Sequence, residues 1–304
     1  MLREISSDYV VVDWGTSNLR VWSIEKGRVV DKQSTPQGVL FMQGKSFSSV
    51  LKNLLDDMAI NWQSLNKIYV VGMAGSNIGW KNTAYLQCPV DLGSLGNFLN
   101  PVDTTWGVDI VIVPGVCINQ QDRQDVMRGE ETQMVWTAVH HSHGIVILPG
   151  THSKWARIQD RQLQTFYTCM TGELFSVLSQ YSVLGRTVAE QVSESMWFEA
   201  GVVLGLQEGG LDTKLFSIRA GSVLGKIAEN GVWDYLSGLL IGSEINVMRN
   251  LLLSGNTYPV TVIGEEKLSQ RYSKALALAD ITHEQLSAEE ALLKGVRFIH
   301  EQAI

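Results

Sequence analysis

The fold is decided by the segment Tyr9-Val-Val-Val-Asp-Trp-Gly-Thr-Ser-Asn-Leu-Arg20. Its apolar start is typical of a short buried strand, which ends at Asp13. A turn that begins at Gly15 follows, and the alternation of apolar and polar residues beyond it predicts two more strands, Leu19 to Ile24 and Arg28 to Thr35. The segment therefore predicts a meander of three strands with a small polar loop after the first strand.

This polar loop, the first Gly-Thr loop, has the composition of a phosphate-binding turn. Glycine permits close approach of a ligand to the backbone, while hydroxyl groups and successive N–H groups cradle phosphate oxygens. The residues predicted to do so are Gly15, Thr16, Ser17 and Asn18. Asp13 beside the loop is a candidate ligand for Mg²⁺. The alternative is an ordinary hairpin in which Asp13 caps its own turn.

The same pattern recurs in the second half of the chain. The segment Ile145-Val-Ile-Leu-Pro-Gly-Thr-His-Ser-Lys-Trp-Ala-Arg157 joins an apolar strand, a Gly-Thr turn and a second strand, and a third strand follows from Gln162 to Thr168. A repeated βββα unit predicts two similar α/β domains, which we place at residues 1–142 and 143–304. The repeat also predicts a second phosphate loop, the second Gly-Thr loop, with Gly150, Thr151 and Ser153 as its binding residues.

Periodicity predicts the other elements of the two domains. Apolar residues at helical spacing predict helices at 47–62, 126–140, 173–181, 194–206, 212–220, 233–253, 268–279 and 288–300. Short apolar runs predict further strands at 67–71, 109–113 and 259–263. Strands that alternate with helices indicate layered α/β domains.

The composition restricts the class of function. The 304 residues are 45% hydrophobic and 18% charged, which is typical of a globular protein with a sizeable core. A net charge of −7 argues against nucleic acid or an anionic membrane as the main partner. No apolar run approaches the ~18 residues of a membrane span, and three separated cysteines do not indicate disulfides or a zinc site. We therefore expect a cytoplasmic protein that acts on small molecules; a homodimer is one state that the sequence allows.

Several blocks of the chain resemble the 2-dehydro-3-deoxygalactonokinase family, a branch of the superfamily of sugar kinases, actin and heat-shock chaperones. The blocks are Val12-Asp-Trp-Gly-Thr-Ser-Asn-Leu-Arg20, Gly72-Met-Ala-Gly-Ser-Asn-Ile-Gly-Trp80, Val126-Met-Arg-Gly-Glu-Glu-Thr-Gln133, Leu148-Pro-Gly-Thr-His-Ser-Lys-Trp155, Met170-Thr-Gly-Glu-Leu174 and Leu236-Ser-Gly-Leu-Leu-Ile-Gly-Ser-Glu244. The resemblance implies two ribonuclease-H-like (actin-like ATPase) domains with a central cleft for ATP and substrate, and a last helix that packs back on the N-terminal domain.

The resemblance also implies an activity and its cofactors. The family phosphorylates 2-dehydro-3-deoxy-D-galactonate at its 6-hydroxyl with ATP and Mg²⁺, in galactonate catabolism. The alternatives are a kinase for 2-dehydro-3-deoxygluconate or another sugar acid, an exopolyphosphatase-like hydrolase, and a non-catalytic ATP-binding clamp of the same fold. A coupled assay of ADP release, without an acceptor and with a panel of sugar acids, separates these four functions.

The remaining site residues follow from analogy with related sugar kinases. The general base is expected to be Asp125 or, as second choice, Glu130, and the alternative for Asp125 is the N-cap of the helix predicted from Val126. Gly264 and Glu265 stand where the superfamily contacts adenosine. The expected substrate-binding residues are Arg20, Ser76, Asn77, Trp80, Arg128 and Glu173. Arg128 or Lys81 is expected to meet the substrate carboxylate, and Arg20 to bind substrate or stabilise the hairpin.

Overall fold

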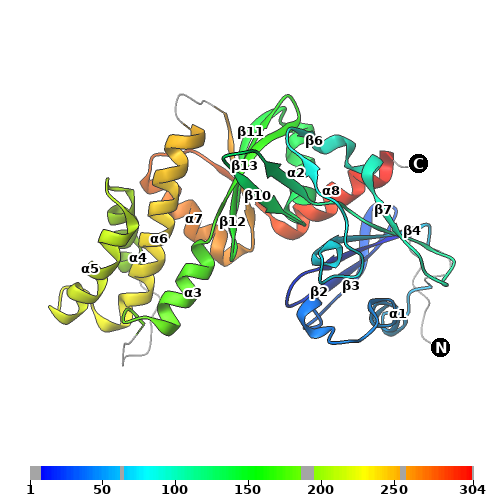
Figure 1. Cartoon of the computed structure of the whole chain (residues 1–304), viewed down its shortest axis with the longest axis horizontal. Helices are drawn as coiled ribbons and strands as arrows, with labels where there is room; N and C mark the ends of the chain where they lie inside the picture. Colours follow the sequence, from blue (N-terminus) through cyan, green and yellow to red (C-terminus); the bar gives the residue numbers. More distant parts are fainter. Residues whose placement is uncertain (1–7, 62–64, 186–194, 254–257, 303–304) are drawn as a thin grey trace. The chain divides into compact units, whose positions relative to one another are not determined.

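The chain forms two compact units, shown in Figure 1. The computed structural model describes residues 8–61, 65–185, 195–253 and 258–302. The first unit consists of Met1–Ser142, Gln159–Gln164 and Glu289–Ile304, and the second unit consists of His143–Ile158 and Thr165–Ala288. Within the described residues, none of the helices combines the length and the apolar character that a membrane span requires.

A mixed sheet with the strand order β3-β2-β1-β4-β8-β7 is the centre of the first unit. Its strands are β1 (Tyr9–Trp14), β2 (Leu19–Glu25), β3 (Arg28–Thr35), β4 (Lys67–Gly72), β7 (Asn100–Val102) and β8 (Asp109–Ile112). β1 pairs antiparallel with β2 and parallel with β4, which is parallel to β8. The predicted meander is thereby confirmed, and the two strands predicted at 67–71 and 109–113 are present.

One face of this sheet is covered by α1 (Phe47–Asp57). Leu51, Leu54 and Leu55 lie on one side of the helix and are buried with the apolar residues of β1 and β4. The hydroxyl of Ser46 accepts a hydrogen bond from Ser49 N and caps the helix, as the sequence predicts. The helix ends at Asp57, before the predicted end at residue 62.

The helix predicted at 126–140 begins later than the sequence indicates. Its first residues instead belong to the strand β10 (Gln124–Met127), which pairs antiparallel with β9 (Val116–Asn119), and β9 pairs with β5 (Leu86–Gln87). The helix α2 (Glu130–His140) starts after Gly129, whose φ of 108° a residue with a side chain rarely adopts. The strand pairing and this glycine outweigh the helical pattern, so the predicted helix start at Val126 is wrong.

The last helix, α8 (Ala288–Gln302), packs within the first unit. A Cβ on Gly295 would lie 2.1 Å from Thr132 O of α2, so the two helices approach closely only because this residue is glycine. The ammonium of Lys294 lies 4.1 Å from the ring centre of Trp136 on α2. The short strand β6 (Val90–Asp91) pairs with Gln162 and Leu163, which belong to the same unit.

The sheet of the second unit repeats the strand order of the first. Its strands are β11 (His143–Leu148), β12 (Ser153–Gln159), β13 (Gln162–Cys169), β14 (Val260–Gly264) and β15 (Glu284–Ser287). The order β13-β12-β11-β14-β15 corresponds to β3-β2-β1-β4-β8, and the parallel pairs β11–β14 and β14–β15 match β1–β4 and β4–β8. The predicted internal repeat is therefore confirmed at the level of topology.

The second unit carries most of the helices, as Figure 1 shows. They are α3 (Thr171–Tyr181), α4 (Ser195–Leu206), α5 (Leu211–Val223), α6 (Val232–Met248), its π-helical continuation Arg249–Leu253, and α7 (Glu266–Leu278). α6 contacts α3, α4, α5 and α7 and is the central helix of the group. Helices α4 and α6 meet backbone to backbone: a Cβ on Gly201 would lie 2.1 Å from Tyr235 O. This leaves a different face of α6 for the site described below.

Candidate functional site

The first Gly-Thr loop is fixed by main-chain hydrogen bonds. Gly15 N donates to Asn18 O at 2.9 Å, and Gly38 N donates to Ser17 O at 3.0 Å. A Cβ on Gly38 would lie 2.3 Å from Ser17 C, so only glycine fits there. Thr16 and Ser17 are exposed, and their N–H groups have no acceptor among the described residues. The loop thus presents free N–H groups and hydroxyls on a rigid support, which is the arrangement of an anion-binding turn.

Asp13 and Arg20 lie side by side at the base of this loop. They are paired across β1 and β2, and Arg20 Nη1 is 3.8 Å from Asp13 Oδ2. Both side chains are partly exposed, at 26% for Asp13 and 39% for Arg20. Such an exposed ion pair contributes little to stability. The Asp13 carboxylate is therefore accessible at the edge of the loop, with Arg20 as its neighbour.

The loop after β4 places its predicted residues in three different environments. Ser76 is buried, and its hydroxyl donates to Met73 O at 2.8 Å within the same turn. Trp80 packs in the core beside Trp14 and Phe47, with ring centres 6.0 and 6.1 Å away. Asn77 is exposed and makes no hydrogen bond with the described residues. Of these three predicted residues, Asn77 is the one whose side chain is exposed.

Arg128 is a buried cation whose guanidinium lies in a socket formed by Thr83 and Tyr85. One guanidinium nitrogen donates to Thr83 Oγ1 and another to Thr83 O at 2.9 Å, while the guanidinium lies 4.2 Å from the ring centre of Tyr85. Arg128 Nε has no hydrogen-bond partner, and no carboxylate contacts the group among the described residues. A Cβ on Gly75 would lie 2.6 Å from Arg128 Nη1, so the socket needs that glycine. An unpaired buried guanidinium is an incomplete anion site.

Lys81, the other candidate for a substrate carboxylate, is engaged elsewhere. Its ammonium donates to Pro101 O at 2.6 Å on the exposed surface. It therefore has a carbonyl partner, whereas Arg128 has a polar socket with one unused N–H donor.

The predicted acidic residues separate into a strand residue and a helix terminus. Asp125 lies on β10 opposite Ile118, and its Oδ1 accepts from Val126 N at 2.8 Å. It does not cap α2, so the predicted N-cap alternative is wrong; the N-cap position belongs to Gly129. Glu130 is the first residue of α2, and its Oε2 accepts from Arg128 N at 3.1 Å.

The start of α2 lies against the end of β4. A Cβ on Gly129 would lie 3.2 Å from Gly72 Cα, and a Cβ on Gly72 would lie 3.2 Å from Asp13 Oδ1. Two glycines in close contact thus bring the helix that carries Glu130 near the carboxylate of Asp13. Sequence reasoning did not single out this contact, although both glycines stand in blocks that it identified.

Glu131 is a buried carboxyl group next to Glu130. Its Oε2 accepts from Gly129 N at 2.7 Å, and its Oε1 accepts from the hydroxyl of Thr132 at 2.9 Å. Burial, together with the neighbouring Glu130 charge, raises the pKa of Glu131 to about 8, although the hydrogen bonds to the carboxyl group oppose this rise. The carboxyl group of Glu131 therefore holds the turn at Gly129 in place and is protonated near neutral pH.

The second Gly-Thr loop is supported by a helix. Gly150 and Thr151 precede β12, and Thr151 O accepts from Glu173 N at 3.0 Å at the start of α3. A Cβ on Gly172 would lie 2.5 Å from Gly150 O, so the helix terminus touches the loop backbone. A helix N-terminus carries partial positive charge and free N–H groups, and both favour an anion at this loop.

Ser153 and Glu173 are both engaged within this unit. Ser153 is fully buried, and its hydroxyl lies 2.7 Å from the hydroxyl of Tyr272. Glu173 Oε2 lies 2.5 Å from Nε2 of His152 on the exposed side of the loop. The Lys154 ammonium is buried and donates to His152 O at 2.9 Å. Ser153 thus supports the loop from the core, and His152 is paired with Glu173 at its surface.

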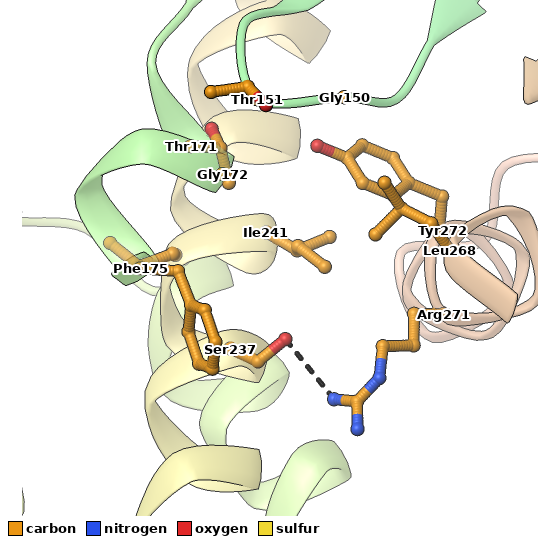
Figure 2. A pocket seen from close by; sticks show the side chains of 11 residues that line it. Gly150, Thr151, Thr171, Gly172, Phe175, Ser237, Ile241, Leu268, Arg271 and Tyr272 are labelled. Atoms are coloured by element: carbon orange, nitrogen blue, oxygen red, sulfur yellow. Dashed lines mark hydrogen bonds between the residues drawn. The ribbon is translucent and has the colours of Figure 1, made fainter. Parts of the chain in front are cut away.

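A cavity of about 360 Å³ opens directly beside this loop. Its lining residues are Gly150, Thr151, Thr171, Gly172, Phe175, Ser237, Leu240, Ile241, Leu268, Arg271 and Tyr272. Figure 2 shows the loop at one end of the cavity and the hydrogen bond from Arg271 Nη1 to Ser237 Oγ, 3.1 Å long, at the other end. Apolar side chains lie between the two ends. The volume is in the range of small-molecule sites, and the arrangement offers anion donors next to an apolar chamber.

The predicted adenosine residues are not among those that line this cavity. Gly264 ends β14, where a Cβ would lie 2.8 Å from Ser269 Oγ and 3.4 Å from Pro149, and Glu265 is exposed before α7. Among the described residues, the cavity is lined instead by Leu268, Arg271 and Tyr272, one turn further along α7. Sequence reasoning missed these residues and their counterparts on α6, although their i, i+3, i+4 spacing places them on one helical face.

Comparisons with known proteins agree on one family. Residues 13–299 match the sequence profile of 2-keto-3-deoxy-galactonokinase. The 2-dehydro-3-deoxygalactonokinase of Escherichia coli K12 is 32% identical over 295 residues, covering 97% of this chain and 98% of that protein.

Solved structures agree with the sequence comparison. A crystal structure of a Sinorhizobium meliloti protein, provisionally assigned as a 2-dehydro-3-deoxygalactonokinase, superposes with a TM-score of 0.89 at 32% identity over 97% of this chain and 98% of that one. Component A of (R)-2-hydroxyglutaryl-CoA dehydratase from Acidaminococcus fermentans covers 98% of this chain and 99% of its own, with a TM-score of 0.52 at 10% identity, and shares the fold alone.

Proposed function

The chain belongs to the 2-keto-3-deoxy-galactonokinase family, and on that premise we propose that it transfers the γ-phosphoryl group of ATP to the 6-hydroxyl of 2-dehydro-3-deoxy-D-galactonate. Full-length similarity to a relative with this activity supports the reaction. The observation that carries the proposal is the second Gly-Thr loop, which closes one end of a cavity of about 360 Å³ with apolar side chains between its two ends. The fold by itself would not carry it, because this fold serves several functions.

The second unit is proposed to bind the nucleotide. The N–H groups of Gly150 and Thr151 and the N-terminus of α3 would receive the phosphates, and the apolar chamber between Phe175 and Leu268 would receive the adenine. Arg271 and Ser237, at the far end, offer hydrogen-bond donors for the polar edge of the base or ribose. Gly264 and Glu265 then act indirectly, because they set the position of α7.

The first unit is proposed to supply the magnesium ligand. The part of the chain that the structure describes has no group of three or more His, Cys, Asp or Glu side chains suited to a metal ion. A single accessible carboxylate, Asp13, fits an ion such as Mg²⁺ that takes most of its ligands from phosphate and water. When bound, the ion would supply positive charge to the phosphoryl oxygens. Gly15, Thr16, Ser17 and Asn18 would offer N–H groups and hydroxyls to the phosphates beside it.

The acceptor hydroxyl needs a base, and two carboxylates are proposed for this role. Asp125 is favoured by analogy with other sugar kinases. The position of Glu130 favours it instead, because α2 begins against Gly72 and thus near Asp13. Comparison of kcat in Asp125→Asn and Glu130→Gln decides between them, since loss of a general base lowers kcat about 10²- to 10⁴-fold.

Arg128 is proposed to bind the carboxylate of the sugar acid. Its guanidinium is already oriented by Thr83 and Tyr85, and its unpaired charge would be completed by an anionic substrate. Asn77 is proposed to bind a hydroxyl of the substrate, with Arg20, Ser76, Trp80 and Glu173 as further candidates. Lys81 is the alternative to Arg128 for the carboxylate. The proposed partners are thus ATP and a small sugar acid, and the proposed compartment is the cytoplasm.

An ADP-release assay with a panel of acceptors tests the function. We expect the highest kcat/KM with 2-dehydro-3-deoxy-D-galactonate and a lower value with its gluconate epimer. ADP release that does not depend on an acceptor would support a hydrolase, and binding of ATP without ADP release would support a clamp. A preference for the gluconate epimer would contradict the proposed substrate.

A further inference from the structure

A buried carboxylate beneath the second Gly-Thr loop has no assigned role. Glu244 lies on α6 with 6% of its surface exposed. Its Oε1 accepts from Trp155 Nε1 at 2.6 Å, and its Oε2 accepts from the hydroxyls of Thr171 and, at 2.9 Å, of Tyr272. Three side-chain donors from β12, α3 and α7 therefore converge on one side chain of α6.

The donor set matches an ionised carboxylate. The indole N–H of Trp155 can only donate, and the two hydroxyls also point their protons at Glu244. Burial raises the pKa of Glu244, and the hydrogen bonds from Thr171, Trp155 and Tyr272 offset part of that rise. No cation is among its contacts in the described part of the chain. A buried anion without a cation is costly, so hydrogen bonds alone must keep it in place.

The partners of Glu244 are parts of the cavity and its loop. Thr171 and Tyr272 line the cavity directly. Tyr272 also contacts the hydroxyl of Ser153, the last residue of the loop. Thr171 is followed by Gly172, which packs on Gly150 O. Through these contacts one carboxylate fixes the loop, the N-terminus of α3 and the inner face of α7.

We propose that Glu244 is the positioning residue of the nucleotide half-site: its carboxylate holds the N-terminus of α3 and, through the hydroxyl of Tyr272, the second Gly-Thr loop, so that the N–H groups of the helix terminus and of the loop converge on the phosphates of ATP. This inference rests on the proposed nucleotide site in the second unit. The residue itself does not touch the nucleotide, because Thr171 and Tyr272 lie between it and the cavity. Its negative charge would repel phosphate, and the three donors disperse that charge.

The substitution Glu244→Gln tests this role at constant shape. The amide presents an NH₂ group to at least one of three donors, which breaks part of the cluster without opening a cavity. We expect the Kd for ADP, measured by calorimetric titration, and the KM for ATP each to rise about tenfold, with the KM for the sugar acid within twofold of wild type. The indole Nε1–H NMR resonance of Trp155 should shift, since it loses a charged acceptor. The matched control is Glu284→Gln, which alters a carboxylate that accepts from Thr261 in the same unit.

A second pair of variants keeps the test decisive. Tyr272→Phe removes one of the three bonds and should raise the Kd for ADP about threefold, even if Glu244→Gln does not fold. An unchanged Kd for ADP in either folded variant would overturn the positioning role, as would an equal rise in both KM values. Ile241→Trp, which fills the cavity, separates this outcome from the parent proposal. If Ile241→Trp leaves ADP binding intact, the nucleotide does not bind there and the assignment of the cavity is wrong.

Discussion

The two Gly-Thr loops occupy equivalent positions in two sheets of the same strand order, yet they are built differently. The first loop is held by main-chain bonds from Gly38 and is flanked by the exposed pair Asp13 and Arg20. The second loop is held by the N-terminus of α3 and, from the core, by Ser153. The duplicated hairpin thus supplies two turns with the arrangement of anion-binding turns, and the difference in their surroundings is the basis for the proposal that one binds the metal and the other the nucleotide.

Removal of the carboxylate at the first loop should give the largest effect. We expect Asp13→Asn to lower kcat with MgATP about 10²- to 10³-fold, because the metal loses its protein ligand while the fold keeps its shape. Arg20→Met is the matched control, since it breaks the same exposed ion pair and leaves the carboxylate. A kcat in Asp13→Asn close to that of wild type would contradict metal binding at the first loop and the proposed difference between the two loops.

Replacement of the buried guanidinium of Arg128 by a lysine ammonium should mainly raise the KM for the sugar acid. Lysine in place of Arg128 keeps the charge but cannot donate to both Thr83 atoms and stack on Tyr85. We expect Arg128→Lys to raise the KM for the sugar acid about 30-fold, with the KM for ATP little changed. Lys81→Met should change neither value more than about threefold, since that ammonium binds a surface carbonyl. The reverse ranking of the two variants would assign the carboxylate to Lys81.

A methyl group added next to the second Gly-Thr loop should mainly raise the KM for ATP. In Gly172→Ala the new Cβ must displace Gly150 O, which it would otherwise approach to 2.5 Å. We expect the KM for ATP to rise about tenfold, because the loop and the N-terminus of α3 no longer meet. Gly144→Ala, whose Cβ meets only Pro259 O at 3.5 Å, is the control in the same sheet. An effect of Gly172→Ala on the sugar acid alone would contradict the division of roles.

The last expected effect concerns stability and not activity: the free energy of unfolding should depend on pH through a group near the first loop. Folding raises the pKa of Glu131 to about 8, so the folded chain keeps a proton that the unfolded chain loses above its ordinary pKa. The free energy of unfolding should therefore fall as the pH rises towards 8. Glu131→Gln should flatten this fall by about 3 kcal/mol between pH 5.5 and 8, measured by urea unfolding. The same substitution at the exposed Glu266 is the control, and an unaltered slope in Glu131→Gln would refute the assignment.

The sequence predicts those features that depend on local pattern. The strands on either side of each Gly-Thr turn show alternation or a short apolar run, and Ser46 is a local cap, so these were identified. The strand β10 was missed because its pairing with β9 is a tertiary contact, and Val126 and Met127 fit a helical pattern equally well. The predicted end of α1 was late for a similar reason, since apolar residues continue beyond Asp57.

The residues of the candidate site also divide into those that local sequence pattern predicts and those that it does not. The residues of both loops were predicted because glycine, threonine and aspartate are recognisable next to a strand. The cavity was not, because Phe175, Ser237 and Arg271 come from three helices that only the folded chain brings together. The burial of Ser153 and of Arg128 was also hidden, since exposure depends on what packs over each residue.

Transfer of labelled phosphate from [γ-³²P]ATP to 2-dehydro-3-deoxy-D-galactonate is the most direct test of the central claim. The product is isolated, and ³¹P–¹³C coupling in its NMR spectrum locates the ester. We expect one phosphate ester at carbon 6 for each ADP formed. Label in inorganic phosphate, an ester at another carbon, or no transfer to this sugar acid would contradict it.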